Sequence, residues 1–233
     1  MRHSKILLAV VLAVTAAAAP AARAASHGRV LATGDSMIQI VDGFLAQSLE
    51  PQHFRVRSDA HIGTGISKPF QLDWVAHARH MARVYRPTAS VVFLGANDGF
   101  PLRLAGKRRD CCGPRWREAY ARRAQAMMHS LSRGGTRTVY WLTLPAARPR
   151  GWNHVYQSVD KALAVAAERE GGAVRLLDMG AVFTPSGHFQ QTIVRGGRRI
   201  SVRQADGIHL NVAGARIAAR VVVRRMRADH LFR

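Results

Sequence analysis

The pattern of apolar residues constrains the fold of this chain more than any other feature of the sequence. Short runs rich in β-branched and aromatic residues alternate with longer segments whose apolar residues recur at helical spacing. This alternation predicts an α/β fold, a three-layer α/β/α sandwich around a mostly parallel sheet. The expected strands cover residues 30–33, 54–58, 90–94, 138–142 and 174–177, and the expected helices cover residues 37–49, 72–85, 115–131, 153–170 and 211–230.

Length and composition indicate one globular domain. The chain has 233 residues, of which 48% are hydrophobic and 21% charged, so it is too apolar to remain disordered. Two cysteines are too few for a disulfide-stabilised scaffold, a zinc ribbon or an iron–sulfur site. The histidines lack a metal-ligand spacing such as His-Glu-x-x-His, so we expect no metal and no other cofactor. The histidines in question are His53, His61, His77, His80, His129, His154 and His188.

Residues 1–24 have the pattern of a secretory signal peptide. A positively charged start precedes an apolar run over residues 6–19, and small residues flank the expected cleavage site after Ala24. The run is shorter than the ~20 residues that span a bilayer, and Pro20 follows it, which argues against an uncleaved membrane anchor. We therefore expect a mature domain of residues 25–233 in the periplasm or outside the cell.

The chain is strongly basic, and the basic residues are nearly all arginine. The formal net charge is +21, and loss of the leader removes three basic residues and no acidic one, which leaves +18. Two interpretations stay open: the arginine content reflects genome base composition, or the surface binds an anionic envelope polymer or membrane surface. Export and the lack of a recognition motif argue against nucleic acid as a partner.

Polar segments follow the expected strands at positions where a parallel sheet binds ligands. Ser36 lies in the sequence Gly-Asp-Ser-Met after the first strand, Gly65 lies in a loop after the second, and Asn97 lies in Gly-Ala-Asn-Asp after the third. Asp206 stands three residues before His209, a spacing that lets a carboxylate orient an imidazole to take a proton from serine. Each segment alone is an ordinary turn or helix cap, but their combination and order are specific.

The combination resembles the SGNH or GDSL-type serine hydrolases, from about residue 30 to residue 214. The family's serine, glycine, asparagine and histidine match Ser36, Gly65, Asn97 and His209. Gly63 is the alternative to Gly65. The sequence is most similar to periplasmic bacterial members of poorly defined function, some of whose relatives handle O-acetyl groups on envelope polysaccharides.

The resemblance implies a flavodoxin-like fold and a serine acyl-enzyme mechanism. His209 would take the proton of Ser36, and Asp206 would orient the imidazole. The oxyanion would be bound by the backbone N–H groups of Ser36 and Gly65 and by the side chain of Asn97. We therefore expect a periplasmic esterase that cleaves acyl esters, above all O-acetyl esters, on envelope carbohydrate or lipid. An O-acyltransferase with the same triad and a non-catalytic binder of anionic polymer are the alternatives.

Several other segments have two interpretations. Residues 99–114, the longest irregular stretch, form either a lid over the substrate or a solvated insertion. Cys111 and Cys112 within it either join another chain or remain free thiols. Trp116 and Trp152 are either core aromatics or a surface that stacks on a sugar. Four arginines on one face of the last helix are either solvated or contact an anionic surface: Arg216, Arg220, Arg224 and Arg227.

Overall fold

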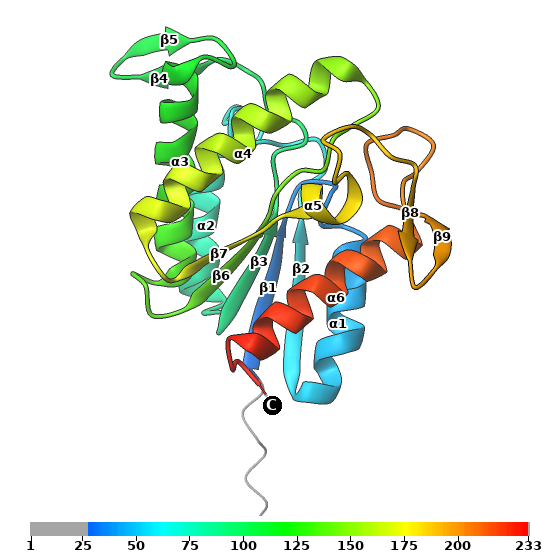
Figure 1. Ribbon diagram of the computed structural model, residues 1–233. Coiled ribbons are helices and arrows are strands. Elements are labelled where there is room, and N and C mark those ends of the chain that lie inside the picture. The colour runs from blue at the N-terminus through cyan, green and yellow to red at the C-terminus, as the bar shows by residue number, and fades with distance from the viewer. Residues whose placement is uncertain (1–27, 233) are drawn as a thin grey trace, which may run out of the picture.

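The computed structural model describes residues 28–232, and its centre is a five-stranded parallel sheet (Figure 1). The expected leader, residues 1–24, lies outside the described residues. The strand order is β2-β1-β3-β6-β7, so β1 and β3 are neighbours at the point where the order reverses. The strands are β1 (Gly28–Gly34), β2 (Phe54–Ala60), β3 (Ala89–Phe93), β6 (Thr138–Leu142) and β7 (Val174–Leu177).

Helices cover both faces of the sheet, which confirms the predicted three-layer fold. In Figure 1, α1 and α6 lie on one face and α2, α3 and α4 lie on the other. The helices are α1 (Val41–Leu49), α2 (Trp74–Val84), α3 (Pro114–Ser132), α4 (Arg150–Glu170), α5 (Met179–Phe183) and α6 (Val212–Ala228), with a short 3-10 helix at Glu50–Gln52. Within residues 28–232, no helix has both the length and the hydropathy required to cross a bilayer.

The centre of the sheet is buried, and the carboxyl ends of β1 and β3 lie at the same height in it. All five residues of β3 are buried, as expected for a strand covered by helices on both faces. Gly34 pairs with Phe93 in the register of β1 and β3. A Cβ on Gly34 would lie 2.1 Å from the Phe93 carbonyl oxygen, so only glycine fits there. The chain segments after β1 and β3 therefore leave the sheet side by side.

Several boundaries differ from the sequence-based expectation. The helix after β1 begins at Val41 and not at residue 37, because residues 36–40 form successive turns. Residues 99–114 are not irregular throughout, since β4 (Leu102–Leu104) and β5 (Lys107–Arg109) pair as an antiparallel hairpin. Strands of three residues are too short to show the alternation by which strands are recognised in a sequence. A second antiparallel hairpin is formed by β8 (Thr192–Arg195) and β9 (Arg198–Ser201).

Candidate active site

Ser36, His209 and Asp206 form a continuous hydrogen-bonded chain at the carboxyl edge of the sheet. The Ser36 Oγ lies 2.8 Å from Nε2 of His209. The other ring nitrogen of His209, Nδ1, lies 2.5 Å from Oδ2 of Asp206. Ser36 stands in the turn after β1, and the other two residues stand in the loop before α6. The fold thus brings together groups 173 positions apart in the geometry required for proton transfer from serine to imidazole.

The loop before α6 holds Asp206 in one orientation. Its Oδ1 accepts hydrogen bonds from the backbone N–H groups of Ile208, at 2.8 Å, and His209, at 3.0 Å. Burial alone would raise the pKa of Asp206, but the hydrogen bonds from the His209 ring and from these N–H groups outweigh it and leave the pKa below its ordinary value. The carboxylate is therefore ionised at neutral pH and oriented toward the imidazole.

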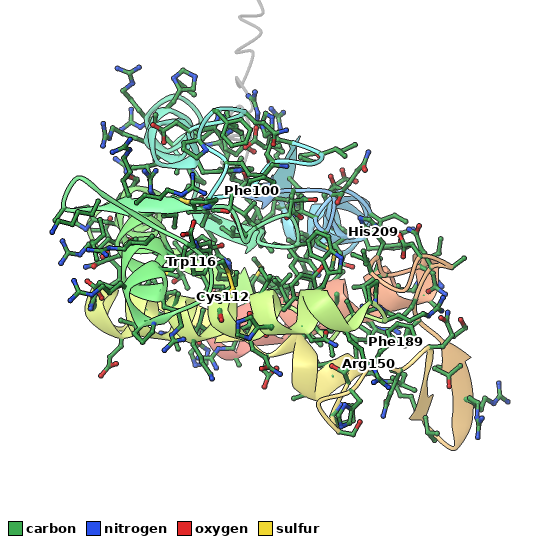
Figure 2. All side chains as sticks on the ribbon, turned by 90° about the horizontal axis from the view of Figure 1, so that it is seen from above. Phe100, Cys112, Trp116, Arg150, Phe189 and His209 are labelled. Atoms are coloured by element: carbon green, nitrogen blue, oxygen red, sulfur yellow. A yellow bond between two sulfur atoms is a disulfide. The ribbon has the colours of Figure 1, made fainter. Side chains whose placement is uncertain are left out.

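Two arginines hold this loop in place through hydrogen bonds to backbone carbonyls. The backbone N–H of Arg148 donates to the Gly207 carbonyl, and its guanidinium donates to the Ala205 carbonyl at 2.8 Å. Arg203 is 2% exposed, and its Nη2 donates to the carbonyls of Ala146 and Gly207. Both guanidinium groups lie over the ring of Phe189, which in Figure 2 is on the same side of the molecule as His209. Burial lowers the pKa of Arg203 to about 10, which leaves it charged at neutral pH.

Asp35 joins the segment that carries the serine to the segment that carries Asn97. Its side chain is fully buried, and Oδ1 accepts the N–H of Met37 at 2.9 Å. Its Oδ2 accepts the N–H groups of Gly95 and Ala96, both at 3.0 Å. Burial raises the pKa of Asp35 to about 6, although the three N–H donors oppose this rise. The residue before the serine is thus a structural link and not a solvent-exposed helix cap.

The loop after β2 and the loop after β3 are fastened to each other. The Asn97 Nδ2 donates to the Thr64 carbonyl at 3.1 Å. Oδ1 of the buried Asp98 accepts the Ser67 N–H at 2.6 Å, and a Cβ on Gly65 would lie 2.7 Å from this same oxygen. These contacts fasten the segments that contain Gly65 and Asn97 to each other, and the role of both residues as oxyanion donors stays a prediction.

Two concave surfaces lie at this edge. A cleft of about 500 Å³ contains Ser36 and His209, and a groove of about 440 Å³ begins at Asp98. The Asp206 and His209 side chains are 39% and 30% exposed, so solvent reaches the hydrogen-bonded chain. The groove is mostly apolar, and its lining includes Phe100, Pro101, Pro149, Trp152 and Val155.

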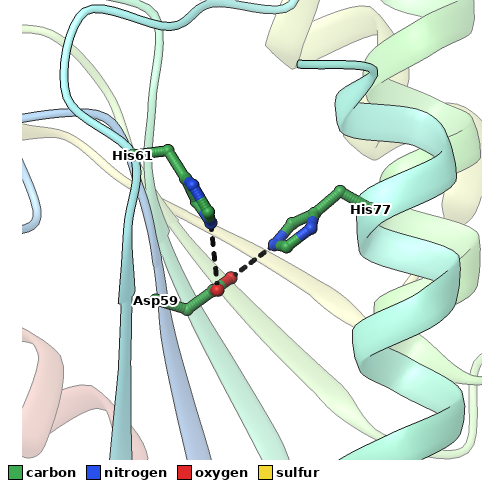
Figure 3. Close-up of side chains that lie close together, drawn as sticks. All are labelled: Asp59, His61 and His77. Carbon is green, nitrogen blue, oxygen red and sulfur yellow. Dashed lines mark hydrogen bonds and ion pairs between the residues drawn. The ribbon is translucent and has the colours of Figure 1, made fainter.

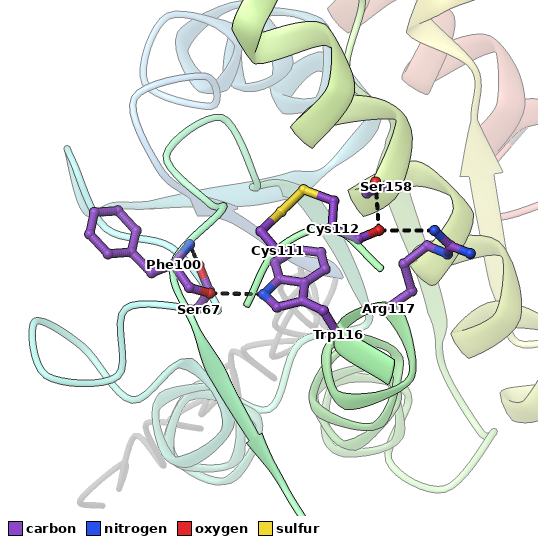
Figure 4. The surroundings of a disulfide bond; sticks show 7 residues. All are labelled: Ser67, Phe100, Cys111, Cys112, Trp116, Arg117 and Ser158. Carbon is purple, nitrogen blue, oxygen red and sulfur yellow. Dashed lines mark hydrogen bonds between the residues drawn. A yellow bond between two sulfur atoms is a disulfide. The ribbon is translucent and has the colours of Figure 1, made fainter. Parts of the chain in front are cut away.

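The structure decides some of the alternatives left open by the sequence. Cys111 and Cys112 form a disulfide with each other, so both expectations, a link to another chain and free thiols, were wrong (Figure 4). Trp116 is 1% exposed and donates to the Phe100 carbonyl, which makes it a core residue and not a sugar platform. Trp152 is half-buried and lines the apolar groove.

The first residues of the segment 99–114 line the groove, whereas its hairpin stands beside α3 at the top of Figure 1. Its role as a lid therefore stays a prediction. The four arginines on α6 are exposed, and two of them lie over aromatic rings, Arg216 over Phe44 and Arg227 over Phe232. In the described part of the chain, the one cluster that brings several metal-ligand atoms close together is Asp59, His61 and His77, on β2, the loop after it, and α2.

Sequence reasoning missed the supporting residues more than the reacting ones. Asp35 was interpreted only as a possible cap, and Arg148 and Arg203 were not considered. Arg148 lies 57 positions from its acceptor Ala205, and Arg203 lies 57 positions from its acceptor Ala146, and no local pattern marks contacts at such a separation. The Gly-Asp-Ser sequence itself indicates a structural role for Asp35, because an acidic side chain at the end of a buried strand requires several hydrogen-bond donors.

Comparisons with known proteins agree with this fold. A family model described as "Protein of unknown function (DUF459)" matches residues 29–225. No curated protein matches the chain. Among solved structures, the C-terminal catalytic domain of peptidoglycan O-acetyltransferase A from Streptococcus pneumoniae is similar, with a TM-score of 0.54 and 15% identity over 87% of this chain and 94% of that chain.

Two further structures are similar at the same level. A family two carbohydrate esterase from Clostridium thermocellum has a TM-score of 0.55 and 13% identity, over 90% of this chain and 66% of its own. A lipolytic G-D-S-L family protein from Veillonella parvula has a TM-score of 0.51 and 16% identity, over 84% of this chain and 96% of its own. At these identities the likeness establishes the fold.

Proposed function

We propose that this chain, which belongs to the DUF459 family and has the fold of the SGNH/GDSL superfamily, is an exported serine esterase that removes acyl groups, above all O-acetyl groups, from cell-envelope carbohydrate or lipid. The observation that carries the proposal is the hydrogen-bonded chain from Ser36 through His209 to Asp206. A buried structural network does not need a half-exposed serine with its hydroxyl on an imidazole, whereas nucleophilic catalysis does.

The chemistry follows from these distances. His209 Nε2, 2.8 Å from the Ser36 Oγ, takes the hydroxyl proton as the oxygen attacks the ester carbonyl. Asp206 stabilises the imidazolium that forms. The imidazolium then gives its proton to the departing alcohol, which leaves an acyl group on the serine. Water, deprotonated by the same imidazole, releases the acid and restores the serine.

The oxyanion of each tetrahedral intermediate requires donors that are in place beforehand. The N–H groups of Ser36 and Gly65 and the side chain of Asn97 are the proposed donors. Asn97 has two amide hydrogens, of which the Thr64 carbonyl holds one, so the other is free to point toward the substrate. Asp35 and Asp98 fix the backbone on either side of these donors.

The substrate class and the location are supported by other observations. Two of the similar structures are named as a peptidoglycan O-acetyltransferase and a carbohydrate esterase, which supports an acylated carbohydrate as substrate. The half-buried Trp152 in the groove beside Asp98 supplies an aromatic face of the kind on which sugars stack. The signal-peptide pattern of residues 1–24 supports export to the periplasm.

The test is hydrolysis of p-nitrophenyl esters, from acetyl to longer acyl chains, together with labelling by a fluorophosphonate. We expect the wild-type protein to release p-nitrophenol and to be labelled, and Ser36→Ala and His209→Ala to abolish turnover with unchanged circular dichroism. Ser186→Ala, at an exposed serine away from the site, is the matched control and should behave as wild type. Turnover retained in Ser36→Ala would overturn the proposal.

An O-acyltransferase with the same residues is the second candidate. The exposure of Asp206 and His209 favours it, because a sugar hydroxyl can reach the acyl-enzyme as readily as water can. Acetyl groups that appear on an oligosaccharide acceptor in preference to free acetate would establish transfer. If the folded wild-type protein neither turns over nor is labelled, and binds anionic polymer in a salt-sensitive way that Ser36→Ala does not change, the protein is a non-catalytic binder.

A further inference from the structure

Two histidines approach one carboxylate beside the loop that follows β2. Nε2 of His77, on α2, lies 2.8 Å from Oδ2 of Asp59, and Nε2 of His61 lies 3.1 Å from Oδ1 (Figure 3). In Figure 3 both imidazole rings point their Nε2 atoms toward the carboxylate from different elements. None of the three residues belongs to the proposed catalytic chain.

The separations between these atoms are close to those of a metal site. In tetrahedral coordination with zinc–nitrogen and zinc–oxygen bonds of ~2.0–2.1 Å, neighbouring ligand atoms lie about 3.3 Å apart. The separations of Nε2 of His77 and of Nε2 of His61 from the Asp59 carboxylate, 2.8 and 3.1 Å, are a few tenths of an ångström shorter than this value. One ligand atom from each of the three residues lies within 4.8 Å of the others. The two nitrogens contact different oxygens of Asp59, so coordination of one ion by all three residues requires their side chains to rotate toward a common centre.

Neighbouring residues restrict the movement of the three side chains. The Thr33 hydroxyl donates to Oδ2 of Asp59 at 2.6 Å, the same oxygen that His77 contacts, which helps to fix the carboxylate. The rings of His61 and His77 meet edge to face, with centroids 4.7 Å apart, and the Trp74 ring packs against both. Asp59 is 10% exposed and His61 37% exposed, so the carboxylate is sheltered while one side stays open to an incoming ion.

We propose that Asp59, His61 and His77 form a binding site for a late first-row divalent cation, with Zn²⁺ as its representative. Two imidazole nitrogens and one carboxylate oxygen are ligands that zinc and its neighbours prefer, whereas Mg²⁺ and Ca²⁺ select oxygen ligands. In the hydrogen-bonded form, each imidazole presents an N–H to the carboxylate. On binding, that proton moves to Nδ1, so each imidazole offers a lone pair with no net loss of a proton.

The site lies next to the loop that carries Gly65. The His61 carbonyl accepts the hydroxyl of Thr64 at 2.6 Å, and the Thr64 carbonyl holds Asn97. A bound ion would fix His61 and, through Thr64, the loop beside the proposed oxyanion donors. The metal site stands on its own geometry and does not require that the protein be an esterase.

The test is a zinc titration of the chelator-treated protein in competition with a chromophoric chelator. We expect one equivalent to bind, with affinity lowered about a hundredfold or more in Asp59→Asn and His77→Gln. His80→Gln is the matched control on the same helix, since His80 is exposed and is not one of the three clustered ligands, and it should bind as wild type. Millimolar Mg²⁺ should not compete.

A second measurement avoids dependence on variants that fold poorly. Cobalt(II) added to the wild-type protein should give the intense visible absorption of a low-coordinate site, and one equivalent of zinc should shift the imidazole NMR signals of two histidines. Absence of tight binding in the wild type would overturn the proposal. So would zinc affinity that is unchanged in folded Asp59→Asn and His77→Gln. None of these readouts depends on ester hydrolysis, so failure of the metal site and failure of the esterase are distinguishable.

Discussion

Substitution of Gly65 by alanine tests the proposed oxyanion loop most directly. The added Cβ would lie 2.7 Å from Oδ1 of Asp98, whereas ordinary contact begins near 3.4 Å. Either the Gly65 backbone or the Asp98 carboxylate must therefore move by about 0.7 Å. The Asp98 carboxylate has little freedom to move, because it is buried and accepts hydrogen bonds from Ser67 and Tyr120 at 2.6 and 2.8 Å.

The two responses have different consequences. If the backbone moves, the Gly65 N–H leaves the position of the developing oxyanion, and loss of one such donor typically lowers kcat by ~10²–10³. If Asp98 moves instead, a buried carboxylate loses a hydrogen bond, which costs roughly 1–3 kcal/mol of the free energy of unfolding. We expect the first response to dominate, so that Gly65→Ala lowers kcat for p-nitrophenyl acetate about a hundredfold with a small decrease in Tm.

Gly63→Ala is the matched control, two residues earlier in the same loop. A Cβ at Gly63 meets nothing within 4 Å, but its φ of +76° is a conformation that alanine adopts at a cost of about 1 kcal/mol. This variant should lose some stability and retain most of its activity. Full activity and stability in Gly65→Ala would refute the reasoning, and a larger loss of kcat in Gly63→Ala would assign the donor to Gly63.

Three further predictions concern residues around the site. Burial raises the pKa of Asp160 from 3.8 to about 7, so the folded chain binds this proton more tightly than the unfolded chain. The free energy of unfolding therefore falls as pH rises through that range. Asp160→Asn should be as stable as wild type near pH 4 and more stable by at most about 4 kcal/mol above pH 7, as measured by unfolding at several pH values. Arg203→Met removes one hydrogen bond to Gly207, in the loop that carries His209, one to Ala146 after β6, and a buried charge, and should lower kcat about tenfold to a hundredfold with little loss of Tm. Cys111 and Cys112 should not react with iodoacetamide before reduction, and after reduction they should take up two equivalents, as measured by mass spectrometry. The unreduced protein should contain no disulfide-linked dimer. Labelling before reduction would contradict the disulfide.

The fold was predictable because its signals are local. The apolar run that became β3 and the alternation of strands and helices follow from side-chain burial along short segments, and all five predicted strands are present. The helix after β1 was misplaced at its start because Met37 and Ile38 are buried in a turn and not in a helix. Apolar residues near a strand end do not reveal which backbone conformation buries them.

The proposed reacting groups were also predictable, because each follows a strand end or opens a helix. Ser36, Asn97 and His209 stand where parallel strands direct side chains to one edge. The bonds that hold them were not predictable, since they join distant segments. Examples are the guanidinium of Arg148 on the Ala205 carbonyl and that of Arg203 on the Ala146 carbonyl, each across 57 positions.

Buried carboxylates beside an oxyanion site present an electrostatic problem that the structure resolves through backbone donors. A negative charge on Asp35 or Asp98 would oppose the oxyanion if it were unscreened. Asp35, however, accepts three N–H groups, and Asp98 accepts the Ser67 N–H and the Tyr120 hydroxyl, so donors within the protein stabilise each charge. Burial also raises the pKa of both groups, which lowers the charge they carry in weak acid. The two acids therefore hold the backbone of three loops without accepting hydrogen bonds from the proposed oxyanion donors, the N–H groups of Ser36 and Gly65 and the Asn97 side chain.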